Sequence, residues 1–171
     1  MNGKDVAFAG LFAALTAVGA QISIPIGPVP ITLQVLFVLL SGLILGARLG
    51  FLSQLVYVVM GALGIPVFAG LQGGIAVIYG PTGGYIIAFP IAAYLAGLFA
   101  ERLGRKGMLI GSALGVGVIY FLGWLRLGLF LGGDFKKAFF LGVTPFLPVD
   151  AVKAAVAVVV TERVRKVVEI R

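Results

Sequence analysis

Two long stretches without charged side chains limit what this chain can fold into. No Asp, Glu, Lys or Arg occurs from Val6 to Ala47, and none occurs from Leu49 to Ala100. Soluble domains carry charge at about a quarter of their positions, whereas this chain is 11% charged and 61% hydrophobic. Such a chain must place most of its surface in lipid, where helices satisfy their own backbone hydrogen bonds. The sequence therefore predicts an all-α integral membrane protein.

Prolines and glycines divide these stretches into segments close to the roughly 20 residues that a membrane-spanning helix needs. A short interfacial helix is expected at 135–141, and no repeat or domain linker is evident. We therefore expect one six-helix membrane domain, residues 1–171. The six predicted helices cover residues 6–23, 33–46, 50–63, 84–103, 108–130 and 147–168.

The segment between the third and fourth helices, residues 64–83, differs from the rest. It is too rich in glycine for a stable helix and too apolar for a solvated loop. Irregular backbone at membrane depth persists only when it is buried in protein or lines a cavity. We therefore expect an irregular cavity-lining or re-entrant segment here, with a long apolar outer loop as the alternative.

The distribution of Lys and Arg predicts the orientation of the chain. Cytoplasmic loops are enriched in these residues, and the helix ends place nine of them on the side of the termini and three on the other. We therefore expect a multi-pass protein of the cytoplasmic (inner) membrane, with both termini cytoplasmic and no nucleic-acid partner. The nine are Lys4, Arg48, Arg102, Arg105, Lys106, Arg163, Arg165, Lys166 and Arg171; the three are Arg126, Lys136 and Lys137.

Several kinds of chemistry lack the residues that they need. The chain has no Cys and no His, which removes thiolate chemistry, the commonest general base and the commonest metal ligand. The sequence has neither a phosphate-binding P-loop motif nor a Ser/His arrangement. We therefore expect no catalytic activity, no metal and no cofactor; an intramembrane enzyme is a disfavoured alternative.

Asp150 and Lys153 form the one deeply placed charged pair. They are three residues apart, so on a helix they share a face. A charged residue near the centre of a span costs about 2.5–3.5 kcal/mol on insertion scales, so such a pair is a candidate functional site. Lys donates and Asp accepts, so together they could bind a solute with NH groups and carbonyl or carboxylate oxygens. The alternative is an ion pair that only ties the last helix to a neighbour.

Other polar residues are also expected at membrane depth. Gln34 and Tyr85 stand just inside the two segments that we expect to border a cavity, so they are candidate ligand contacts. Gln21 and Gln54 lie within predicted spans, where a glutamine more often bonds a neighbouring helix.

The first predicted helix has a stripe of small residues, Ala9, Ala13 and Ala17, flanked by Gly10 and Ala14. Small residues at this spacing let helices approach closely. The spacing alone leaves two interpretations open, which are packing within the bundle and docking of a separate membrane protein.

Five motifs are spread over nearly the whole chain. They are AALTAVGAQI at 13–22, PVPITLQ at 28–34, GIPVFAG at 64–70, GPTGGY at 80–85 and the Asp-x-x-Lys pair at 150–153. The Pro-Val-Pro-x-Thr-x-Gln and Pro-Thr-Gly-Gly-Tyr elements are the most specific of them. Together these motifs resemble one family, the biotin-specific S components (BioY) of energy-coupling-factor (ECF) transporters.

The resemblance implies a six-helix protein that captures biotin from outside the cell with high affinity. It implies partners, namely a transmembrane coupling subunit and two ATPase subunits, with Ala9 and Ala13 contacting the coupling subunit. It also implies that Asp150 and Lys153 hydrogen-bond biotin, in a pocket that includes the loop after the first helix and the segment between the third and fourth. The candidate substrate-binding residues are Asp150, Lys153, Tyr85, Gln34, Thr82, Gly73 and Gly74.

The sequence thus predicts substrate capture for biotin uptake, energised by separate ATPase and coupling subunits, with biotin as transported ligand. Two alternatives stay open. One is an S component for another vitamin or small solute. The other is a membrane scaffold subunit that takes no part in transport.

Overall fold

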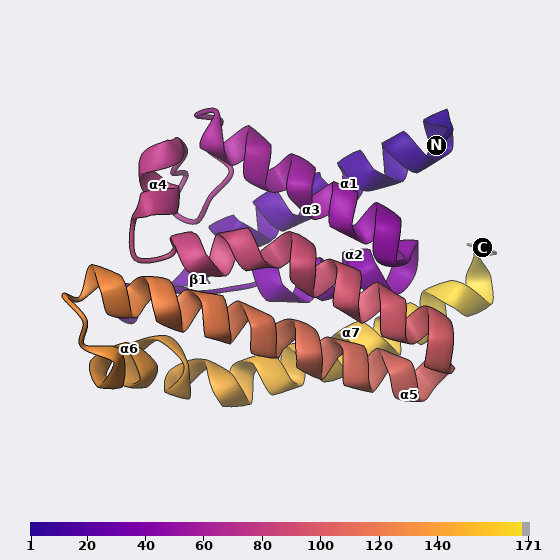
Figure 1. Ribbon diagram of the computed structural model, residues 1–171. Coiled ribbons are helices and arrows are strands. Elements are labelled where there is room, and N and C mark those ends of the chain that lie inside the picture. Colours follow the sequence, from indigo (N-terminus) through magenta and orange to yellow (C-terminus); the bar gives the residue numbers. More distant parts are fainter. Residues whose placement is uncertain (169–171) are drawn as a thin grey trace.

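The structure, a computed structural model, describes residues 1–168, and its helices follow the pattern of prolines and glycines (Figure 1). Each predicted long helix is present, with ends that differ by a few residues. The third helix begins earlier than predicted because a single residue, Gly46, separates it from the second. The elements are α1 (Gly3–Gln21), β1 (Ser23–Ile24), β2 (Ile31–Thr32), α2 (Gln34–Leu45), α3 (Ala47–Ala62), α4 (Ile75–Tyr79), α5 (Gly83–Phe130), α6 (Phe135–Gly142), η1 (Thr144–Phe146) and α7 (Leu147–Val167).

The longest helix, α5, comprises two of the predicted helices. Gly104 interrupts it with φ 60° and ψ −135°, a conformation that glycine adopts without steric cost. The two halves then pack antiparallel: a Cβ on Gly107 would collide with the backbone of Phe99, and one on Gly111 would lie 2.9 Å from Ala96. Glycine thus provides both the reversal and the close approach of the two halves.

Counting the halves of α5 separately, α1, α2, α3, α5 and α7 provide six long helices in the part of the chain that the structure describes. This is consistent with the predicted six-helix architecture. By length and composition, α1, α5 and the stretch Phe135–Val167 are long and apolar enough to cross a membrane. The helices α2 and α3 are apolar but shorter.

The centre of the bundle is α2, which contacts α1, α3, α5 and α7. Its Val38, Leu39 and Leu43 are completely buried. Figure 1 shows both termini at one end of the bundle, together with the reversal in α5. We call this the terminal end. The β-hairpin, α4 and α6 lie at the opposite end, which we call the loop end.

Two irregular segments follow the helices that reach the loop end. The proline-rich stretch after α1 forms the loop of a two-stranded hairpin, in which Ser23 pairs with Thr32 and Ile24 with Ile31. The glycine-rich segment after α3 is irregular as predicted, but it also contains the five-residue helix α4, which the sequence did not indicate.

Candidate functional site

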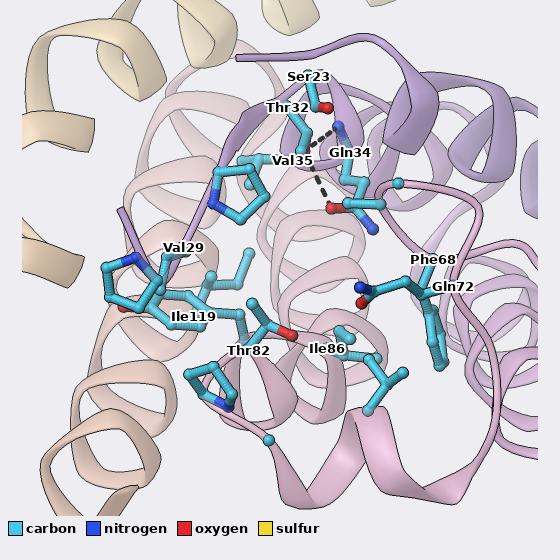
Figure 2. A pocket seen from close by; sticks show the side chains of 18 of the residues that line it. Ser23, Val29, Thr32, Gln34, Val35, Phe68, Gln72, Thr82, Ile86 and Ile119 are labelled. Carbon is cyan, nitrogen blue, oxygen red and sulfur yellow. Dashed lines mark hydrogen bonds between the residues drawn. The ribbon is translucent and has the colours of Figure 1, made fainter. Parts of the chain in front are cut away.

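A cavity of about 680 Å³ lies at the loop end. The hairpin and the glycine-rich segment form two of its walls, and α2, α5 and α7 form the others. The prediction that residues 64–83 line a cavity is therefore confirmed. Figure 2 shows Ser23, Thr32 and Gln34 on one side of this space, with Val29, Phe68, Gln72 and Thr82 on others.

The candidate pair Asp150 and Lys153 lies on the cavity wall, in the first turns of α7. Both are buried, with 2% and 7% of their surface exposed. The Lys153 Nζ donates to Asp150 Oδ1 at 2.9 Å and also to the carbonyl oxygen of Thr32 in β2. The Tyr120 hydroxyl, from α5, donates to Asp150 Oδ2 at 2.6 Å. The pair therefore joins α7 to both β2 and α5.

Gln34, at the start of α2, also lines the cavity and is 7% exposed. Its Nε2 donates to the Tyr57 hydroxyl at 2.7 Å, and its Oε1 accepts from the Thr32 hydroxyl at 3.0 Å. Tyr57 in turn donates to the carbonyl of Val67 at 2.8 Å. A continuous hydrogen-bonded series thus runs from Tyr120 through Asp150, Lys153, Thr32, Gln34 and Tyr57 to Val67.

The other candidate residues fall into two groups. Tyr85, Thr82 and Gly73 line the cavity, and Tyr85 also donates to the carbonyl of Gly142 at 2.7 Å. Gly74, in contrast, is not among the residues that line it. It forms the N-cap of α4 with φ 102°, a conformation that favours glycine, so the backbone turn explains why glycine occurs here.

Two polar side chains fix the glycine-rich segment from outside the cavity. Gln21, in α1, donates to the carbonyl of Phe68 and accepts from the backbone N–H of Leu71, both at 2.9 Å. Arg126, in α5, donates to the carbonyl of Tyr79, the last residue of α4. Gln21 therefore bonds another part of the chain and does not line the cavity, but its partner is a loop and not the neighbouring helix that we expected.

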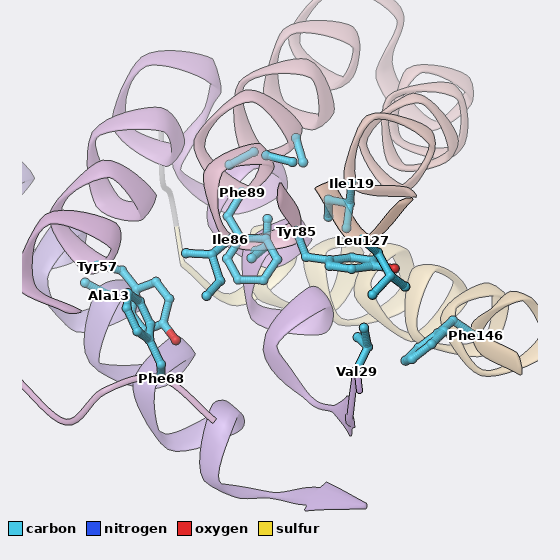
Figure 3. Packing of buried hydrophobic residues seen from close by; sticks show 14 of the residues in the cluster. Ala13, Val29, Tyr57, Phe68, Tyr85, Ile86, Phe89, Ile119, Leu127 and Phe146 are labelled. Atoms are coloured by element: carbon cyan, nitrogen blue, oxygen red, sulfur yellow. The ribbon is translucent and has the colours of Figure 1, made fainter. Parts of the chain in front are cut away.

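Most of the remaining cavity surface is apolar, with Ser23 and Gln72 as further polar residues. Figure 3 shows Phe89, Ile86, Tyr85 and Ile119 close together in the core that underlies the cavity. Sequence reasoning selected Tyr85 as a pocket residue, but not Phe89, Ile86, Ile119, Tyr120 or Gln72. Lining residues that the sequence did not indicate include Val29, Phe68, Gln72, Ile86, Phe89, Ile119, Tyr120 and Phe146.

A second polar cluster lies away from the cavity, between α1, α2 and α3. It consists of Thr16, Ser41, Ser53 and Gln54, all completely buried. The Nε2 of Gln54 donates to the hydroxyls of Thr16 and Ser41 at 3.0 and 3.3 Å. Ser53 donates to the carbonyl of Ala9 at 2.8 Å. The cluster therefore bonds helices to one another, as expected for Gln54.

The small residues of α1 face two directions. Ala9 and Ala13 are buried, with 7% and 1% of their surface exposed, and Ala9 is bonded to Ser53 of α3. Their burial favours packing within the bundle, one of the two interpretations that the spacing left open. Gly10 and Ala14, the flanking residues, are exposed. Docking through Ala9 and Ala13 stays a prediction.

The site thus combines a large apolar space with a few fixed polar groups at one corner. Pockets for small molecules usually have this composition and hold roughly 300–1,000 Å³. Among residues 1–168, no group of three or more acidic, His or Cys side chains could hold a metal. Fold and cavity together define a membrane protein that binds a small solute.

Within that class, the chain belongs to the BioY family, whose sequence model matches residues 1–170. It is 60% identical to a probable biotin transporter BioY of Pyrococcus horikoshii over 166 residues, which cover 96% of this chain and 98% of the relative. It is 45% identical to the biotin transporter BioY of Thermotoga maritima, over 92% of this chain and 94% of the relative.

One solved structure is also closely similar. It is a crystal structure of the S-component for biotin from an ECF-type ABC transporter, 30% identical to this chain with a TM-score of 0.88. The match covers 97% of this chain and 95% of that one.

Proposed function

We propose that this chain is the biotin-binding S component of an ECF-type transporter in the cell membrane. The observation that carries this proposal is the buried Asp150–Lys153 pair on the wall of a largely apolar cavity. The family, the names of the relatives and the similar crystal structure agree with it. The chain captures its ligand and catalyses no covalent change.

The cavity suits the chemistry of biotin. Biotin has an apolar bicyclic body, a ureido group with two N–H donors and a carbonyl, and an anionic valerate tail. The aromatic and aliphatic walls can bury the body, while donors and acceptors at the polar corner fix its orientation. Of the predicted binding residues, this proposal retains Asp150, Lys153, Gln34, Tyr85, Thr82 and Gly73, which line the cavity.

We propose that further subunits energise uptake, because the similar crystal structure is of an S-component from an ECF-type ABC transporter. The sequence of this chain has no P-loop motif. The proposed partners are a transmembrane coupling subunit and two ATPase subunits. Eight of the nine basic residues predicted to face the cytoplasm lie in the described chain, near the two termini, at the α2–α3 turn and at the reversal in α5; Arg171 lies outside it. Both termini and the reversal lie at the terminal end, so we place that end in the cytoplasm. The cavity then faces outward, where biotin is captured.

The coupling subunit is proposed to dock on α1, as the resemblance implies. Ala9 and Ala13 are buried against the bundle, so a partner would reach Gly10 and Ala14 beside them more easily. Ala14→Trp is expected to preserve biotin binding and to reduce co-purification with the coupling subunit. Co-purification at the wild-type yield would contradict docking on this face.

Biotin binding itself can be tested on the purified chain in detergent or nanodiscs. We expect calorimetric titration to give saturable, tight binding without ATP or partner subunits. Thiamine and riboflavin serve as competitors of different shape, which should not displace biotin. Absence of saturation with biotin would overturn the proposal, and saturation by another vitamin alone would support the alternative of a different S component.

A further inference from the structure

Tyr57 lies behind the cavity wall and has a fixed hydrogen-bonding direction. The side chain is completely buried and is not among the residues that line the cavity. Its hydroxyl has one hydrogen, and the Val67 carbonyl, 2.8 Å away, can only accept it. The tyrosine oxygen must therefore act as an acceptor toward Gln34, which is 2.7 Å away.

This direction fixes the orientation of the Gln34 amide, which could otherwise be placed either way round. The NH₂ group must face Tyr57, because a carbonyl oxygen there would meet an oxygen with no hydrogen to offer. The amide oxygen then faces the hydroxyl of Thr32, which donates to it at 3.0 Å. Tyr57 and Thr32 thus hold the two ends of the same amide.

A fixed amide determines what the cavity wall offers to a ligand. One N–H of Gln34 is used by Tyr57, and its second N–H has no acceptor among residues 1–168. The Lys153 ammonium has three hydrogens, of which Thr32 and Asp150 accept two. Gln34 and Lys153 both line the cavity and both bond Thr32, so the wall beside Thr32 presents two spare donors.

We infer that Tyr57 is a positioning residue for ligand recognition, acting through Gln34. It holds the Gln34 amide so that Gln34 and Lys153 together donate to an acceptor oxygen of the ligand. The inference rests on the proposed function, because it assumes that biotin occupies this cavity. The acceptor is either the ureido carbonyl or the valerate carboxylate, which share this chemistry.

A double-mutant cycle tests whether Tyr57 acts through Gln34. Tyr57→Phe, which removes only the hydroxyl, is expected to raise the Kd for biotin about tenfold. In a Gln34→Leu background the same change should have little further effect, because the amide that it positions is gone. The matched control is Tyr94→Phe, which should bind like wild type. Tyr94 is an exposed tyrosine on α5, whereas Tyr57 is buried on α3.

Thr32→Val provides a second route if Tyr57→Phe does not fold. It removes the hydroxyl that holds the amide oxygen but keeps the backbone carbonyl that bonds Lys153. It also removes the acceptor of the Gln34 backbone N–H, which Gln34→Leu leaves in place. Thr32→Val should therefore weaken biotin binding, and clearly less in the Gln34→Leu background than in wild type. An equal loss in both backgrounds, or unchanged binding in both single variants, would overturn the inference.

Two ligand analogues identify the acceptor oxygen. In 2-iminobiotin a nitrogen replaces the ureido oxygen, and in the second analogue a methyl group replaces the carboxylate. Gln34→Leu should no longer weaken binding of whichever analogue lacks the oxygen that Gln34 contacts. If it weakens both analogues as much as biotin, the donor pair is wrong. If wild type does not bind biotin at all, the proposed function fails instead.

Discussion

Two buried polar clusters in this bundle have similar residues and different surroundings. The cavity cluster comprises Thr32, Gln34, Tyr57, Tyr120, Asp150 and Lys153, and it borders the cavity at the loop end. The helix cluster comprises Thr16, Ser41, Ser53 and Gln54, and it lies between α1, α2 and α3. Each contains a glutamine that bonds hydroxyls of neighbouring elements.

The difference lies in what each cluster leaves unused. In the cavity cluster, donors of Gln34 and Lys153 remain for a ligand. In the helix cluster, both hydrogens of Gln54 Nε2 are used, and its Oε1 is buried without a partner among the described residues. Buried polarity alone therefore does not indicate a binding site, and our proposal rests instead on spare donors that border a cavity.

The largest effect is expected for Lys153→Met. The change leaves the Asp150 carboxylate, 2% exposed, without its cation, so biotin binding should weaken by more than about 2 kcal/mol. Calorimetric titration measures the loss, with the exposed Lys136→Met as control. Binding at the wild-type level would favour the alternative in which the pair only ties α7 to its neighbours. Asp150→Asn should act in the same direction.

A smaller effect is expected for Tyr120→Phe. This change removes the donor to Asp150 Oδ2 but leaves the ion pair in place. Loss of one hydrogen bond to a charged group should raise the Kd for biotin about tenfold. Tyr79→Phe, at an exposed tyrosine, should have no effect. If Tyr120→Phe binds as tightly as wild type, Asp150 does not depend on Tyr120 for its placement.

The fold and the charged pair were predictable because their signals are local. Prolines, glycines and charged turns each mark a helix end by themselves, and Asp150 and Lys153 stand out in an apolar span. Tyr120 has no such signal, because it lies inside the long second half of α5, and only the packing of α7 against α5 brings it to Asp150.

The sequence also could not predict which face of α1 packs against the bundle. In lipid both faces of a helix are apolar, so the pattern does not show that Ala9 and Ala13 point inward while Gly10 and Ala14 point outward. Residue type did not separate Gly73 from Gly74 either, since their roles depend on the turn that begins α4.

The smallest effect on binding is expected for Gln54→Leu, the same substitution as Gln34→Leu in the other cluster. The hydroxyls of Thr16 and Ser41 keep their bonds to backbone carbonyls, and interhelical bonds of this kind contribute only about 0.6 kcal/mol on average. Thermal unfolding should shift slightly, while the Kd for biotin stays within about twofold. A loss as large as that of Gln34→Leu would remove the distinction between the clusters.

Thr32 contributes to the cavity cluster through two different parts of the residue. Its hydroxyl donates to the Gln34 amide oxygen and accepts from the Gln34 backbone N–H, whereas its carbonyl oxygen, which accepts from Lys153, is present whatever side chain the residue carries. Alanine scanning would therefore record only the contribution of the hydroxyl. The position of the carbonyl depends on the hairpin, in which Thr32 pairs with Ser23. Substitutions elsewhere in the hairpin that shift its register would expose the contribution of the carbonyl.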